Sequence, residues 1–294
     1  MSAFIDAHRA RFGVEPICRI VGVSESAYCK RASGERSRRR VEDERLPGLI
    51  RELHARNWFA YGSRRVWLAL RREGHEVGRD RIRRLMRQDG IEGAKRRVKR
   101  LRTTIPDHAA ARPSDLVERN FRAACPDALW VADFTYLRSW QGVVYFSFVL
   151  DAYSRRVVGW QVASNMRTSL VLDALRIAVS RRHAGADVQL VHHSDAGAQP
   201  GLNDFQQALD DNQVLASIGS VGDAFDNAMA QSFVDTFKTE LLADRVFTTH
   251  RSLQLAIVEW VAWYNQQRLH ERIGDIPPDE YEQLYYAARQ EPAA

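Results

Sequence analysis

Three polar positions in this sequence have the side chains and the spacing needed to hold divalent cations. Asp133 lies within the apolar run LWVADFTYL, and Asp195 lies in VHHSDAGAQ. Gln231 follows after thirty-five intervening residues, in FDNAMAQSFVDTFKTE. Acids on two strands and an oxygen donor on a later helix can hold two metal ions about 3.5–4 Å apart, an arrangement that drives phosphodiester chemistry. Hard oxygen ligands select Mg²⁺ or Mn²⁺ over zinc, so we expect two such ions at Asp133, Asp195 and Gln231.

The elements that must position these residues are predicted from a change of periodicity near residue 128. Strand-like runs occupy 129–139, 143–152, 156–164 and 188–195; helical patterns occupy 168–183, 201–212, 226–242 and 248–270; and 214–220 is a brief strand or a loop. Three antiparallel strands, a helix and then strand–helix units is the element order of the ribonuclease-H-like fold. The predicted fold class is therefore α/β, with a mixed five-stranded sheet. In that fold the first and fourth strands are neighbours, which would bring Asp133 and Asp195 together.

The helix at 226–242 must bring position 231 to the same place. Its predicted core side consists of apolar residues that recur every four positions: Met229, Phe233, Phe237 and Leu241. Gln231 lies about 200° around the helix from that side. With Asp235 and Lys238 it forms a polar stripe, which either faces the metal ions and the DNA backbone or is a solvated helix face.

Positive charge is concentrated in the first third of the chain. Residues 1–105 contain 27 Lys and Arg against 13 Asp and Glu, a net charge of +14, whereas residues 106–294 carry a net charge of −8. Most of the basic residues are arginine, whose planar fork matches phosphate better than lysine does. A basic module joined to an acidic remainder favours nucleic-acid binding over the alternative of a solvated basic face.

The basic part is predicted to consist of short helices. Residues 1–45 have the outline of a helix-turn-helix, with Gly22 as a break and Ser24 as the N-cap of a second helix. In the following unit, 46–95, an apolar stripe and an arginine face share the helix RDRIRRLMRQDG, which Gly90 ends. The arginines expected to contact DNA there are Arg79, Arg83, Arg84 and Arg87. A basic linker, 96–125, either follows the phosphate backbone or is a disordered tether, and the cations around its start are Lys95, Arg96, Arg97 and Lys99.

Five longer strings carry a family resemblance. They are WVADFTYL (130–137), VLDAYSRRVVGW (149–160), HHSDAGAQ (192–199), GDAFDNAMAQSFVDTFKTEL (222–241) and WYNQQRLHERIGDIPP (263–278). Together and in this order they resemble the OrfB transposases of insertion-sequence family three, within the DDE transposase and retroviral integrase superfamily. The likeness covers nearly the whole chain. It implies an enzyme that ends a transposon strand in a free 3′-hydroxyl, which then attacks another phosphodiester without a covalent enzyme intermediate.

Position by position, the resemblance makes Asp133 and Asp195 the first two catalytic acids and places Gln231 where the family has a glutamate. A glutamine offers a neutral carbonyl oxygen, and charge neutralisation contributes much of the affinity for a hard divalent ion. Metal stabilisation of the transition state is worth several kcal/mol, and about 1.4 kcal/mol is a tenfold change in rate. We therefore expect the chain as written to be severely impaired. A decayed natural copy and a deliberate Glu→Gln change both explain the glutamine; rescue by Asp235 or Glu240 is the less favoured third reading.

The resemblance also implies partners and DNA contacts. In the catalytic half it adds Lys238, Arg268 and His270 as DNA-binding residues. The expected partners are double-stranded DNA (inverted-repeat ends and target DNA), further copies in a homo-multimer, and an upstream OrfA product fused by frameshifting, with no membrane association. The expected location is the bacterial cytoplasm, at the nucleoid. The predicted domains are 1–45, 46–95, the linker 96–125, an integrase catalytic core at 126–245 and a helical extension at 246–294.

The sequence leaves open other functions and other possible metal ligands. The rival functions are a catalytically dead DNA-binding regulator and a ribonuclease-H-like nuclease that cuts without joining. Asp151 is a possible metal ligand, although a turn-forming aspartate is favoured. His192 and His193 are expected to pack or to orient neighbours rather than to bind metal. The stripe on the 248–270 helix is expected to pack onto the core, with base stacking as the alternative.

Overall fold

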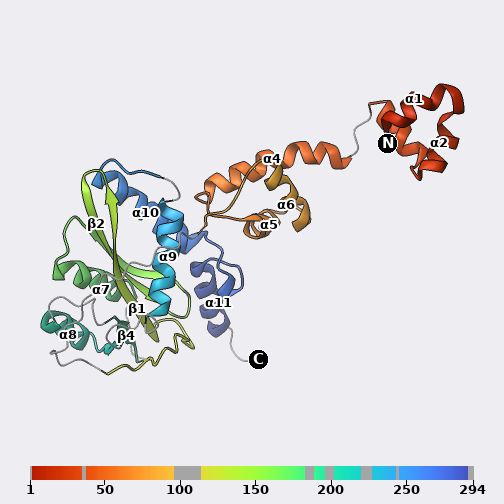
Figure 1. Ribbon diagram of the computed structural model, residues 1–294. Helices are drawn as coiled ribbons and strands as arrows, with labels where there is room; N and C mark the ends of the chain where they lie inside the picture. Colours follow the sequence, from red (N-terminus) through yellow and green to blue (C-terminus); the bar gives the residue numbers. More distant parts are fainter. Residues whose placement is uncertain are drawn as a thin grey trace.

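The computed structural model describes residues 2–34, 38–95, 114–182, 189–195, 202–219, 227–242 and 245–290. Figure 1 shows a helical unit at the N-terminus, a second helical unit, and a sheet with helices on both faces. None of the described helices is both long and apolar enough to cross a bilayer.

One mixed sheet forms the centre of the larger part. Its strands are β1 (Leu129–Ser139), β2 (Gly142–Asp151), β3 (Val157–Ala163), β4 (Val191–Ser194) and β5 (Leu215–Ile218). Their spatial order is β3-β2-β1-β4-β5. The β1–β2 and β2–β3 pairs are antiparallel, whereas β1–β4 and β4–β5 are parallel. The predicted α/β class with five mixed strands is confirmed, and the short segment near 215 is a strand rather than a loop.

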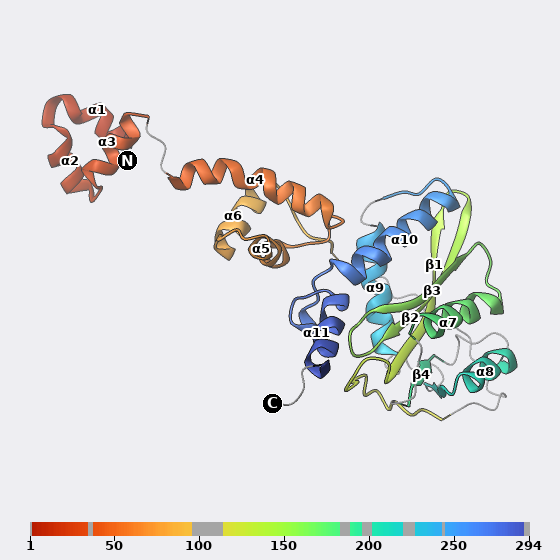
Figure 2. The same ribbon diagram turned by 180° about the vertical axis from the view of Figure 1, so that it is seen from behind.

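Alternation along β1 divides its side chains between two cores. Val131 and Leu137 belong to one buried cluster, and Trp130 and Ala132 to the other, because successive side chains of a strand point to opposite faces. The first face is covered by α9 (Ala228–Leu242) and α10 (His250–Gln266), and the second by α7 (Thr168–Arg182) and α8 (Leu202–Asp211). Figure 2, seen from behind, shows the same three-layer arrangement.

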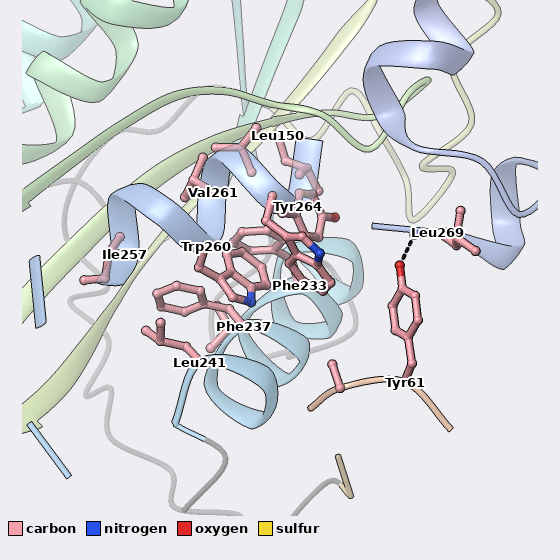
Figure 3. Packing of buried hydrophobic residues seen from close by; sticks show 14 of the residues in the cluster. Tyr61, Leu150, Phe233, Phe237, Leu241, Ile257, Trp260, Val261, Tyr264 and Leu269 are labelled. Carbon is pink, nitrogen blue, oxygen red and sulfur yellow. Dashed lines mark hydrogen bonds between the residues drawn. The ribbon is translucent and has the colours of Figure 1, made fainter. Parts of the chain in front are cut away.

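Aromatic side chains fill the space between the sheet and α9 and α10 (Figure 3). Phe237 of α9 stacks on Phe146 of β2 with ring centroids 4.6 Å apart, and Phe233 lies 4.4 Å from Phe148. Trp260 of α10 meets Phe237 edge-on at 4.9 Å. The core side expected for α9 and the stripe expected on α10 are therefore both buried. Base stacking by that stripe has no support, because its aromatic rings are enclosed.

The N-terminal unit consists of α1 (Ser2–Phe12), α2 (Val14–Val21) and α3 (Glu25–Ala32). Gly22 ends α2 in the left-handed region, with a φ of 66°, and Ser24 is the N-cap position of α3. Both boundaries were predicted, the one at Gly22 because only glycine takes that φ without strain. Ile20, in contrast, is 86% exposed and does not share the buried stripe of Ile17.

The second helical unit consists of α4 (Arg38–Arg56), α5 (Ser63–Arg72) and α6 (Arg79–Gln88). Helix α4 begins at Arg38, within the polar and charged stretch 33–45. Gly90 follows α6 with a φ of 66°, and the Ile91 N–H donates to the Met86 carbonyl at 2.8 Å. This is the glycine-dependent helix stop that the sequence predicted.

The second unit packs against the C-terminal end of the chain. The Leu269 N–H donates to the Tyr61 hydroxyl at 2.9 Å (Figure 3), and Arg64 forms an ion pair with Asp275 at 2.6 Å. A 3₁₀ turn, η1 (Glu271–Ile273), and a last helix, α11 (Pro278–Gln290), follow α10. Helix α10 ends at Gln266, four residues before the predicted end, so residues 267–270 form a connection instead of a last helical turn.

Candidate metal centre

Parallel pairing of β1 with β4 brings Asp133 and Asp195 together. Ala132 pairs with Ser194 in register, so the next residue of each chain segment lies beside the other. Asp133 follows Val131 by two positions on β1, and Val131 belongs to the cluster that packs against α9. The two-residue repeat of a strand therefore turns the Asp133 side chain toward α9.

Helix α9 brings Gln231 to the same place. The Gln231 side-chain Nε2 donates a long hydrogen bond, 3.5 Å, to Oδ2 of Asp133. Asn227, immediately before the helix, donates from Nδ2 to the Ala132 carbonyl at 3.2 Å and so attaches the start of α9 to β1. The sequence reading missed this asparagine, although a polar residue at a helix start is a recognisable signal. The structure thus gathers all three predicted positions at one site.

Burial and a neighbouring like charge act on the Asp133 carboxyl. Burial raises the pKa of Asp133 to about 7, and the Asp195 charge acts in the same direction. The Phe134 N–H, which donates to Asp133 Oδ1 at 2.7 Å, and the Lys238 ammonium act in the opposite direction. A cation between the two carboxylates would offset their repulsion and favour their charged forms.

Lys238 lies on the same stripe of α9, as predicted. Its ammonium lies 4.9 Å from the centroid of the Tyr136 ring, a cation–π geometry. Burial lowers the pKa of Lys238, while the carboxylates of Asp133 and Asp235 oppose that change. The ammonium therefore extends the polar stripe from the carboxylate pair toward the exposed side of β1.

The donor set matches a hard divalent cation at two of its three positions. Asp133 and Asp195 supply carboxylate oxygens, whereas Gln231 supplies a neutral amide; within the described ranges no group of three His, Cys, Asp or Glu side chains could hold an ion. Glu240 is not a substitute, because it is buried and bound by Arg268 Nε at 2.8 Å and Nη2 at 2.7 Å. Asp235 stays on the exposed part of the helix.

Asp151, His192 and His193, the other possible metal ligands, lie in surroundings that fit a role in the fold. Asp151 accepts hydrogen bonds from the Asp127 and Ser154 N–H groups, both at 2.8 Å, so it is the predicted turn-forming aspartate. Burial lowers the pKa of His192 to about 4. His193 Nδ1 lies 2.9 Å from the Ser217 hydroxyl. Both histidines are buried, in agreement with packing roles.

The arginine face of α6 is only partly free to meet DNA. Arg79, Arg83 and Arg87 are exposed, and the described part of the chain contains no ion pair to any of them. Arg84 differs from the expectation, because its Nη2 lies 2.7 Å from the Asp43 carboxylate on α4. Its charge is committed to packing two helices together.

Of the four cations expected to contact DNA near the start of the linker, the structure describes one. Lys95 is exposed and forms an ion pair with Glu92. Arg96, Arg97 and Lys99 lie outside the described residues.

Arg268 and His270, which were expected to contact DNA, are both buried in the structure. Arg268 is 5% exposed and His270 is 8% exposed. Arg268 forms a bidentate ion pair with Glu240, and its Nη1 donates to His270 Nδ1 at 3.1 Å. The charge of Arg268 therefore faces Glu240, and a DNA contact by either residue stays a prediction.

Comparison with known proteins places the whole chain in a family. Residues 123–224 and 212–278 match models described as "Integrase core domain", and residues 41–100 match an "HTH-like domain". A candidate transposase for insertion sequence element IS986/IS6110 from Mycobacterium tuberculosis is 44% identical over 276 residues, which covers 92% of this chain and 99% of that protein.

The chain belongs to the insertion-sequence transposases with an integrase core domain. The transposase for insertion sequence element IS629 from Shigella sonnei is 41% identical over 294 residues, covering 98% of this chain and 97% of the relative. Transposase InsF for insertion sequence IS3A from Escherichia coli is 28% identical, covering 95% and 97%. This membership agrees with the resemblance to OrfB transposases of insertion-sequence family three.

Proposed function

We propose that this transposase family member is built for metal-dependent cleavage and joining of DNA strands at insertion-sequence ends, with its chemistry at Asp133, Asp195 and Gln231. The observation that carries the proposal is the meeting of these three positions, from β1, the end of β4 and α9, on the sheet face covered by α9. Family membership supports the reaction class, because it covers both the helix-turn-helix-like and the integrase core parts.

Asp133 and Asp195 are the residues that would hold Mg²⁺ or Mn²⁺. Two such ions, when bound, would activate an attacking hydroxyl or water and stabilise the leaving 3′-oxygen of a phosphodiester. The chain itself contributes the paired interior strands β1 and β4, which bring the two carboxylates together, and Lys238, which adds a positive charge beside Asp133. Phosphate of the bound strand would lie against that charge.

Gln231 leaves this constellation incomplete. A glutamate there would accept rather than donate a hydrogen bond and would add a third negative charge. With glutamine, the side chain donates to Asp133, and thus binds one of the carboxylates that a cation needs. We expect a rate at least about 100-fold below that of a glutamate version, equivalent to about 3 kcal/mol.

DNA binding in this proposal begins on the exposed arginines of α6. Arg79, Arg83 and Arg87 form one exposed face of a helix in the HTH-like region, which suits phosphate contacts. The inverted-repeat ends, a multimer of this chain and a fused OrfA product are the finer parts of the proposal. They rest on the family alone.

The test is strand transfer on labelled insertion-sequence ends with Mg²⁺, comparing this chain with Gln231→Glu. Joined products should form with the glutamate version and be at least about 100-fold scarcer with the chain as written. Equal, full activity of both would refute the role given to position 231. No product from the glutamate version, with DNA still bound, would favour a DNA-binding regulator. Cleavage without joining of a pre-cut 3′-hydroxyl end would favour a nuclease.

A further inference from the structure

A pocket of about 540 Å³ lies on a different flank of α9 from the candidate metal centre. The α9 residues that line it are Ala228, Met229, Ser232, Phe233 and Thr236, and its lining contains none of the three metal-site positions. The volume falls within the roughly 300–1,000 Å³ typical of small-ligand sites.

Arginine dominates the wall of this pocket. Six lining residues are arginines: Arg65, Arg119, Arg122, Arg155, Arg268 and Arg272. They come from four segments that are far apart in sequence: α5, the chain before β1, the β2–β3 turn, and the connection between α10 and α11. Glu271 is the one carboxylate among the lining residues of this described pocket. We name this feature the arginine pocket.

The charges of the arginine pocket are only partly neutralised from within. Arg268 and Arg65 approach the same buried carboxylate, Glu240, at 2.7 Å and 3.6 Å. Arg155 is held in the turn after β2 with a φ of 66°, and no ion pair to it is found in the described part of the chain. One buried carboxylate therefore serves two guanidinium groups, and among the described residues no carboxylate forms an ion pair with the third, Arg155.

The pKa values of Arg155 and Arg65 also reflect burial of positive charge in the arginine pocket. Burial lowers the pKa of Arg155 and the Arg272 charge adds to that effect, whereas Tyr264 and the Asp151 carboxylate act in the opposite direction. Burial and then the Arg268 charge lower the pKa of Arg65, whereas Glu240, Tyr61 and Glu271 raise it. Uncompensated buried positive charge is unfavourable, so an anion in the pocket would stabilise the arrangement.

We propose that the arginine pocket binds phosphate groups of a DNA strand, as a site separate from the metal centre. Arginine forks bind phosphate oxygens in bidentate pairs, and the exposed Arg119, Arg122 and Arg272 give a strand access to the half-buried Arg65 and Arg155. A phosphate held there would contact both α5 and the catalytic core, and so would join the second helical unit to the core when DNA is bound. The choice of DNA over a free polyphosphate rests on the proposed function; the phosphate site does not.

The experiment is calorimetric titration of the full chain, at low salt, with inorganic tripolyphosphate and separately with a single-stranded 20-nucleotide DNA. The test variant is Arg122→Gln with Arg272→Gln, two exposed side chains whose replacement leaves the core intact. The matched control is Arg176→Gln with Arg181→Gln, which removes the same charge from exposed positions on α7. We expect at least about tenfold weaker binding of both probes by the test variant, less than about twofold change in the control, and displacement of tripolyphosphate by the DNA.

Three outcomes would overturn the proposal. They are no tripolyphosphate binding by the unaltered chain, equal losses in the test and control variants, and DNA that binds without displacing tripolyphosphate. These readouts need no strand transfer. Failure of Gln231→Glu to join DNA, with tripolyphosphate binding retained and lost in the test variant, would therefore count against the proposed function and not against the phosphate site.

Discussion

Two carboxylates on neighbouring strands, the half-buried Asp133 on β1 and the buried Asp151 at the end of β2, differ in their hydrogen-bond partners and in the charges beside them. Asp133 is approached by Asp195 and receives a 3.5 Å hydrogen bond from Gln231. Asp151 accepts hydrogen bonds of 2.8 Å from the backbone N–H groups of Asp127 and Ser154. Burial raises the pKa of both, to about 7 for Asp133 and about 6 for Asp151.

The surroundings of Asp151 continue into a closed network. Arg182 Nη1 donates to Glu282 Oε2 at 2.7 Å, and its Nε donates to Asp127 at 2.9 Å. Glu282 also accepts from the Ser154 hydroxyl at 2.6 Å. We refer to Asp127, Asp151, Ser154, Arg182 and Glu282 as the Asp151 network. A carboxylate that is fully hydrogen-bonded within the protein, as Asp151 is, stabilises the fold. A carboxylate beside a second negative charge, as Asp133 is, is suited to binding a cation.

The largest expected difference between the two regions is catalytic. In the Gln231→Glu background, Asp133→Asn should lower strand transfer by at least about 1,000-fold. The change removes a ligand of the metal ions that would stabilise the transition state. Asp151→Asn should lower the yield of folded protein, while activity per folded molecule changes by less than about threefold. Initial rates of joining, normalised to the folded fraction by circular dichroism, measure both. Similar losses of activity per folded molecule in the two variants would contradict the assignment of a catalytic role to Asp133 alone.

The next effect is on stability, and it is expected in the Asp151 network. Glu282→Ala leaves Arg182 buried without its main partner, and breaking one side of a buried pair costs about 3–5 kcal/mol. Urea unfolding of the variant measures this cost. The control is Glu280→Ala on the same helix, which removes an exposed pair with Arg72 and should cost no more than about 1 kcal/mol.

A smaller effect is expected on thermal stability when Mg²⁺ binds at the candidate metal centre. Mg²⁺ should raise the thermal midpoint of Gln231→Glu more than that of the chain as written, since binding to the folded state at 100 times Kd adds about 2.7 kcal/mol. Differential scanning calorimetry with and without Mg²⁺ reads this out. Asp195→Asn in the glutamate background should abolish the shift, and an undiminished shift would place the ion elsewhere.

The smallest effect is a pH dependence in the Asp151 network. Burial alone would raise the pKa of Glu282, but the hydrogen bonds and charge of Arg182 outweigh it and leave that pKa below the usual 4.5. A lowered folded-state pKa adds stability above the unfolded pKa, and this stability is lost as pH falls through the folded value. Unfolding free energies below pH 5 should therefore fall more steeply for the unaltered chain than for Glu282→Gln. Parallel pH curves would contradict this.

Local patterns were enough to predict most of the fold. The alternation around Asp133 and the four-residue repeat of Met229, Phe233 and Phe237 identify β1 and α9, because strand and helix periods are properties of short segments. Gly22 and Gly90 end helices for an equally local reason, their left-handed φ. The sequence also singled out Asp133, Asp195 and Gln231 before any contact was known.

Burial and pairing of the cations could not be predicted in this way. Arg84 and Arg268 appear in the sequence as basic residues near others of their kind, and the structure pairs them with Asp43 and Glu240. Those partners lie 41 and 28 residues away, so no helical or strand period connects them. An ion pair between distant residues depends on how whole elements pack.

The sequence by itself determined which residue types are present at the three metal positions, and above all that position 231 carries an amide instead of a carboxylate. Tertiary structure alone decided the register of β1 against β4, the packing of α9 over β1, and the lining of one pocket by arginines from four segments. The physical reason is the range of the interactions. Side-chain chemistry and local periodicity belong to a few consecutive residues, whereas charge compensation and burial depend on chain segments that meet only after folding.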